Sequence, residues 1–76
     1  NPFSGDQSLK ITSRVAQPMT LKVWNSAGQQ VAAVSYTLAQ GVNTVRVPAA
    51  SWAAGLYYYE FRTGSGEKFS RKGLKQ

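Results

Sequence analysis

The C-terminal end of the sequence, residues 68–76, contains a run of basic side chains. Four cations lie there with two apolar residues beside them: Lys68, Phe69, Arg71, Lys72, Leu74 and Lys75. A strand of this kind can add to the sheet of a partner, where main-chain hydrogen bonds give affinity and alternate side chains give specificity. Charges on an edge strand are equally an ordinary guard against self-association. The residue types leave both interpretations open.

The other residue types exclude most catalytic and metal chemistry. The chain has no histidine and no cysteine, so it lacks a Ser-His or Cys-His nucleophile pair and any thiolate metal site. Its acids are Asp6, Glu60 and Glu67, which leave little for a carboxylate pair or an oxygen-ligated cation. We therefore expect a protein that is not an enzyme and holds no metal or cofactor.

The charge balance is strongly basic, with nine Lys or Arg against three acids and a formal net charge of +6. Such a chain attracts polyanions, although the charge also improves solubility. The basic residues are spread out rather than interleaved with aromatic residues along one strand, which disfavours nucleic acid. A rival hypothesis is a carbohydrate-binding or accessory module in which Trp24, Trp52 and Tyr58 form a platform for a sugar ring. The alternative is that these rings cover the fold itself.

The element that must position these groups is the run Gly55–Arg62, which is rich in bulky and aromatic residues. Read with a period of two, Tyr57, Tyr59 and Phe61 share an uncharged face that we place inward. An edge strand this apolar would invite aggregation. We therefore expect a central strand that is paired on both sides.

Shorter alternating segments surround this run and predict further strands. They are Ser8–Ser13, Met19–Asn25, Gln30–Tyr36, Asn43–Val47 and Glu67–Leu74. Asn25–Gly28 and Thr63–Gly66 have the chemistry of hairpin turns. We expect Asn1–Asp6 to be a linker or turn, and Pro48–Gly55 to be a tight corner with Trp52 folded onto the core. The pattern predicts an all-β fold, a small antiparallel β-sandwich of about six or seven strands, with a small barrel as the second choice.

Length and termini indicate a single domain over residues 1–76. No apolar stretch approaches the roughly 20 residues that span a bilayer as a helix. The sequence begins with Asn1 rather than methionine, and its first residues do not resemble a signal peptide. We expect a piece excised from a longer polypeptide.

Several motifs, in this order, resemble a known family. They are Asn1-Pro2-Phe3, the segment Val23–Val31, Gly41-Val42-Asn43, the segment Trp52–Tyr59 and the closing stretch Glu67–Lys72. Together they resemble the C-terminal sorting domain (type A) of the bacterial type IX secretion system, over essentially the whole chain. Trp52 stands where the family more often has leucine, and Gly73 interrupts the apolar-basic ending of many members.

The resemblance implies an immunoglobulin-like sandwich that follows a cargo domain and is recognised by the outer-membrane translocon. It further implies removal by a sortase-like protease and attachment of the mature cargo to an anionic lipopolysaccharide. The implied route runs through the periplasm to the cell surface or medium of a Gram-negative bacterium of the Bacteroidetes type. Apart from the resemblance, an open edge strand would permit a weak homodimer.

The resemblance also assigns residues. The implied recognition residues are the six of the closing segment: Lys68, Phe69, Arg71, Lys72, Leu74 and Lys75. The family positions that we expect to form turns and core are Asn25, Gly28, Gly41, Asn43, Gly55, Tyr57 and Tyr59.

Overall fold

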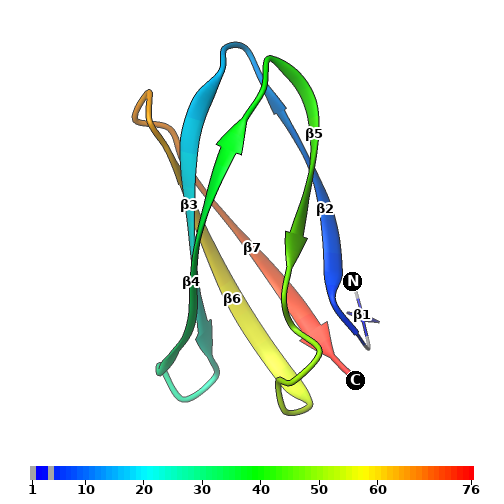
Figure 1. The fold of residues 1–76 in the computed structure, drawn as a ribbon. Helices are drawn as coiled ribbons and strands as arrows, with labels where there is room; N and C mark the ends of the chain where they lie inside the picture. The colour runs from blue at the N-terminus through cyan, green and yellow to red at the C-terminus, as the bar shows by residue number, and fades with distance from the viewer. Residues whose placement is uncertain (1, 4) are drawn as a thin grey trace.

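The alternating segments form seven strands in the computed structural model, which describes residues 2–3 and 5–76 (Figure 1). The strands are β1 (Pro2–Phe3), β2 (Gln7–Ser13), β3 (Gln17–Asn25), β4 (Gln30–Leu38), β5 (Gly41–Val47), β6 (Gly55–Thr63) and β7 (Lys68–Lys75). Each predicted strand is present, with ends shifted by a few residues at most. Within the described part of the chain, no helix has the length and apolarity needed to cross a membrane.

The strands form two sheets, of which the larger has the order β1-β7-β6-β3-β4 and the smaller pairs β2 with β5. All pairings are antiparallel except that of β1 with β7. The order β7-β6-β3-β4 in one sheet, with β2 and β5 paired in the other, matches the strand order of immunoglobulin-like sandwiches. The predicted β-sandwich is therefore confirmed.

The run of tyrosines occupies the centre of the larger sheet, as expected. β6 pairs with β3 on one side and with β7 on the other. Tyr57, Tyr59 and Phe61 point into the space between the sheets and are buried. They pack there with apolar residues from the other strands: Ile11, Met19, Leu21, Val23, Leu38, Val45, Val47 and Ala49.

The hairpin between β3 and β4 closes through the side chain of Asn25. Its Oδ1 accepts hydrogen bonds from the backbone N–H groups of Ala27 and Gln29, both at 3.0 Å. Gly28 follows with φ of 82°, a conformation that costs glycine little. The predicted turn is confirmed.

The hairpin between β6 and β7 depends on a close contact that the sequence does not reveal. The N–H of Gly64 donates to the carbonyl of Pro18 at 2.8 Å. A Cβ at Gly64 would lie 2.8 Å from Cδ of Pro18, so this position excludes larger residues by contact.

The segment between β5 and β6 forms the tight corner expected from the sequence. The N–H of Trp52 donates to the carbonyl of Ala49 at 3.1 Å. The half-buried indole packs on Tyr57, with ring centroids 4.7 Å apart. The hydroxyl of Tyr57 donates to the carbonyl of Ala53 at 2.6 Å. A tyrosine near the start of this strand, bonded back to the preceding corner, is the tyrosine corner of immunoglobulin-like folds.

The first residues depart from the prediction of a linker. Pro2 and Phe3 pair in parallel with Leu74 and Lys75, so β1 covers the end of β7. Asn1, part of the first family motif, lies outside the described residues.

Candidate recognition surface

The pleat of β7 divides the predicted recognition residues between two faces of the sheet. Lys68, Lys72 and Leu74 are exposed and share the face that points away from the core. Phe69 and Arg71 share the opposite face with Lys75. The six residues therefore do not form one surface in the folded domain.

Two of the core-facing residues are occupied by contacts within the fold. The ring of Phe69 stacks on that of Phe61, with centroids 4.7 Å apart and an interplanar angle of 11°. Lys75 is only 5% exposed, and its Nζ donates to the carbonyls of Ala49 at 2.9 Å and Ala50 at 3.2 Å. A partner that reads the folded domain therefore does not reach the ammonium of Lys75.

Arg71 differs because it is exposed although it faces the smaller sheet. It lies at an opening between β2 and β7 whose walls include Lys10, Thr12 and Phe69. A partner can reach Arg71 from that side of the sandwich.

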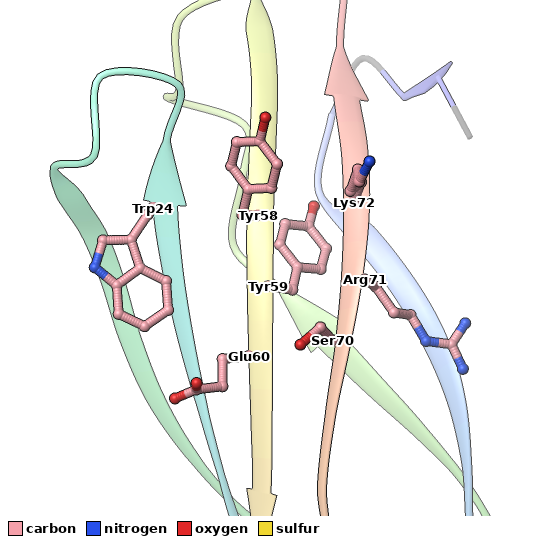
Figure 2. Close-up of a pocket in the computed structure, with 7 residues that line it drawn as sticks. All are labelled: Trp24, Tyr58, Tyr59, Glu60, Ser70, Arg71 and Lys72. Carbon is pink, nitrogen blue, oxygen red and sulfur yellow. The ribbon is translucent and has the colours of Figure 1, made fainter.

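A depression of about 280 Å³ lies on the sheet beside β7 (Figure 2). Its lining residues come from β3, β6 and β7: Trp24, Tyr58, Tyr59, Glu60, Ser70, Arg71 and Lys72. Trp24 is directly opposite Tyr58, and Tyr58 is directly opposite Lys72, so the three form one row across adjacent strands. Figure 2 shows the two rings on neighbouring strands, each with a face turned outward.

The outer face around this depression has a net positive charge. The cations Lys22, Arg62, Lys68 and Lys72 lie there with one carboxylate, Glu60. Glu60 makes only long ion pairs of 4.0 Å with Arg62 and with Lys68. The face therefore offers aromatic surface and positive charge together, which suits an anionic partner.

The three aromatic residues that the sequence suggested as one platform do not come together. Trp24 and Tyr58 lie on the outer face, and Tyr58 is 41% exposed. Trp52 instead packs against the core-facing rings of Tyr57 and Tyr59. The platform is thus reduced to two rings, because the strand pleat separates Tyr57 from Tyr58.

The family-motif residues have structural roles in this chain. Oδ1 of Asn43 accepts from the N–H of Ala39 at 2.8 Å, and its Nδ2 donates to the carbonyls of Ala39 and Gly41. This side chain holds the connection between β4 and β5, as Asn25 holds the preceding hairpin. Gly28, Gly41 and Gly55 have positive φ angles. Tyr59 is buried, and desolvation followed by the nearby Tyr57 raises its pKa to about 12.

An ion pair at the start of β2 was not foreseen. The carboxylate of Asp6 pairs with Arg46 and accepts a hydrogen bond from the N–H of Ala50 at 3.0 Å. The hydrogen bond from Arg46, and then that from Ala50, lower the pKa of Asp6 from its ordinary value of 3.8. The residue types alone gave no signal, because the partners lie about 40 positions away in sequence.

Comparison with known families gives a single interpretation. The model of the secretion system C-terminal sorting domain family matches residues 1–76, the whole chain. No curated protein matches the chain. The chain belongs to the C-terminal sorting domains of type IX secretion, a family of export signals rather than of enzymes. It therefore acts with the type IX machinery and a preceding cargo region, in export to the cell surface or medium.

Proposed function

We propose that the outer-membrane type IX translocon recognises this domain in its folded state and that a sortase-like protease then removes it. The family match over the whole chain carries this proposal. The route would run through the periplasm of a Gram-negative bacterium of the Bacteroidetes type. The released cargo would then be joined to an anionic lipopolysaccharide.

The outer face of the larger sheet is the surface that we propose is recognised. It displays Lys68, Lys72 and Leu74 of the closing strand, and Leu74 is 44% exposed. The row Trp24, Tyr58 and Lys72 lies on the same face, next to the depression. Phe69 and Lys75 would support recognition indirectly, by fixing the position of β7 in the sheet.

A fusion assay tests the proposal. The 76 residues are attached to the C-terminus of a periplasm-targeted fluorescent protein, in a bacterium that carries the type IX system. We expect fluorescence in the medium or on the surface, and its loss when the translocon is deleted. A shorter exported product than the fusion would support cleavage. Fluorescence that stays in the periplasm with an intact, folded fusion would contradict the proposal.

A charge reversal separates surface recognition from folding. Lys68→Glu with Lys72→Glu changes the outer face, whereas Lys10→Glu with Arg14→Glu makes the same charge change at exposed positions of β2 and the loop after it. We expect the first pair to block export and the second to permit it. Equal export of both variants would exclude the outer face as the recognised surface.

A second function is favoured by the pair of outward-facing rings. A pyranose ring has an apolar C–H face that can pack on an aromatic face, while Glu60, Ser70 and Lys72 offer polar partners at the rim of the depression. Titration with an acidic polysaccharide tests this binding. Saturable binding that Trp24→Ala and Tyr58→Ala both abolish would support it, and binding that neither variant changes would exclude it.

A further inference from the structure

The larger sheet ends at β4, which has a neighbour on one side only. β4 spans nine residues, Gln30–Leu38, and pairs with β3. Among the residues that the structure describes, no strand pairs with its other side. This side of β4 is called the β4 edge below.

The hydrogen bonds of β3 show which backbone N–H and C=O groups of β4 point toward the β4 edge. The carbonyl of Pro18 accepts from Gly64, so the backbone groups of Pro18 face β6. In antiparallel sheets this direction alternates along the strand, so Met19 and Leu21 face β4. Their partners, Tyr36 and Val34, therefore bond to β3. Ala33, Ser35 and Thr37 direct their N–H and C=O groups away from the sheet.

The sequence of β4 lacks the charges and prolines that native edge strands often carry. Every other strand longer than β1 in the described chain has at least one charged residue, whereas β4 has neither a charge nor a proline. The pairing of β3 with β4 has one irregularity, at the start of β4: Val23 is opposite Ala32 and Trp24 is opposite Gln30, so Val31 has no partner on β3. From Ala32 to Leu38 the register is regular. The side chains beside the edge, Ala33, Ser35 and Thr37, are small or medium in size, uncharged and exposed. The uncharged edge from Ala32 to Leu38 is a template for a further strand.

We propose that the β4 edge pairs with the β4 edge of a second copy of this domain. With a two-fold axis at Ser35, Ser35 lies opposite its counterpart, and Ala33 lies opposite Thr37 of the second copy. Each copy then satisfies the outward-facing N–H and C=O groups of the other, and the two five-stranded sheets become one.

The absence of charge on β4 makes it an edge at which two copies of this cationic domain can pair without placing cation against cation. The domain has a formal net charge of +6, so two copies repel each other in most orientations. β7 carries Lys68, Arg71, Lys72 and Lys75, and contact between two such strands would place cation against cation. The seam between two β4 edges brings no charged side chain of β4 against another. Screening by salt should therefore strengthen this association.

Two proline variants test the proposal. Ser35→Pro removes an N–H that faces the edge without removing a bond to β3. Thr44→Pro is the matched control on β5. The carbonyl of Arg46 accepts from the hydroxyl of Tyr36 and so faces away from β2, and Thr44, two residues earlier, faces the same way. Both prolines thus replace an outward N–H near the middle of an exposed strand.

Sedimentation equilibrium of the 76-residue chain, up to millimolar concentrations and at low and high salt, measures the association. We expect a monomer–dimer equilibrium that salt strengthens, an association constant at least about tenfold lower for Ser35→Pro, and little change for Thr44→Pro. A wild-type chain that stays monomeric at high salt, or a Ser35→Pro chain that dimerises as wild type does, would overturn the proposal.

Amide hydrogen exchange of the wild-type chain provides a test that needs no variant. The amides of Ala33, Ser35 and Thr37 should exchange fast in dilute solution and become protected as concentration rises. The amides of Val34 and Tyr36, which face β3, should be protected at both concentrations. Concentration-dependent protection that falls on β2 or β5 instead would place the interface elsewhere and reject this one.

Discussion

The two ends of the larger sheet differ in charge and in whether another strand covers them. At one end, β7 is basic and its last residues are covered by β1. At the other end, β4 is uncharged, and in the described chain its outer side has no paired strand. The first end thus combines charge with cover, two of the devices that prevent strand addition, whereas the second uses neither. The covered end is thus protected against strand addition, and the open end is the edge at which we propose that a second copy associates.

The covered end is fixed to one short segment, the corner between β5 and β6. Lys75 donates to the carbonyls of Ala49 and Ala50, and Tyr57 donates to that of Ala53. Asp6 accepts from the N–H of Ala50. Elements from both ends of the chain therefore meet at this corner. At the open end, a hydrogen bond across the sandwich runs from the hydroxyl of Tyr36 to the carbonyl of Arg46, at 2.6 Å, and Leu38 packs into the core.

The largest expected effect concerns the core beneath β6, the central strand that lies next to β7. Tyr59→Ala leaves a cavity at a residue that is 2% exposed and should cost ~3–5 kcal/mol of the free energy of unfolding. Tyr36→Ala, the same change at a half-buried position on β4, should cost less. Urea denaturation monitored by circular dichroism measures both. Equal losses would mean that the edge strand β4 contributes as much to stability as the central strand β6.

Removal of the buried ammonium of Lys75 should have the next largest effect on the free energy of unfolding. Lys75→Met keeps an unbranched aliphatic side chain but leaves the carbonyls of Ala49 and Ala50 without this donor. The free energy of unfolding should fall by ~1–3 kcal/mol. Lys72→Met, on the exposed face of the same strand, serves as the control and should change the free energy of unfolding little. If both substitutions have the same small effect, Lys75 does not anchor the strand.

The tyrosine corner should contribute less. Tyr57→Phe keeps the packing against Trp52 but removes the hydrogen bond to Ala53, at a cost of ~0.5–1.5 kcal/mol. Tyr58→Phe alters the exposed ring on the opposite face and should be nearly neutral. The same urea titration distinguishes them, and a neutral Tyr57→Phe would show that packing alone holds the corner.

The smallest expected effect is that of Asp6 on stability at acidic pH. The folded-state pKa of Asp6 is lowered, mainly by Arg46, so its contribution to stability is complete above its ordinary pKa of 3.8. This contribution is lost as the pH falls from there through the lower folded-state pKa. Asp6→Asn should therefore flatten the dependence of the thermal midpoint on pH in this range. An unchanged profile would exclude Asp6 as its source.

Apart from β1, the sequence alone determined the strands, the direction of their side chains and the hairpin turns. Alternation of apolar and polar residues is a local property, so the inward set Tyr57, Tyr59 and Phe61 was readable before any contact was known. Turn chemistry is equally local, because the side chain of Asn25 bonds to the backbone of the turn that it begins. The order of motifs along the chain was sufficient to indicate the family.

Only the tertiary structure decided which residues share a surface. The row Trp24, Tyr58 and Lys72 exists because three strands pair in one particular register. Lys75 resembles the other lysines of β7 in sequence, yet it is buried because carbonyls of a corner about 25 residues away lie within reach of its Nζ. The open edge of β4 likewise depends on which strands pair with it. Strand register and long-range proximity are set by the packing of distant segments, and no local pattern encodes them.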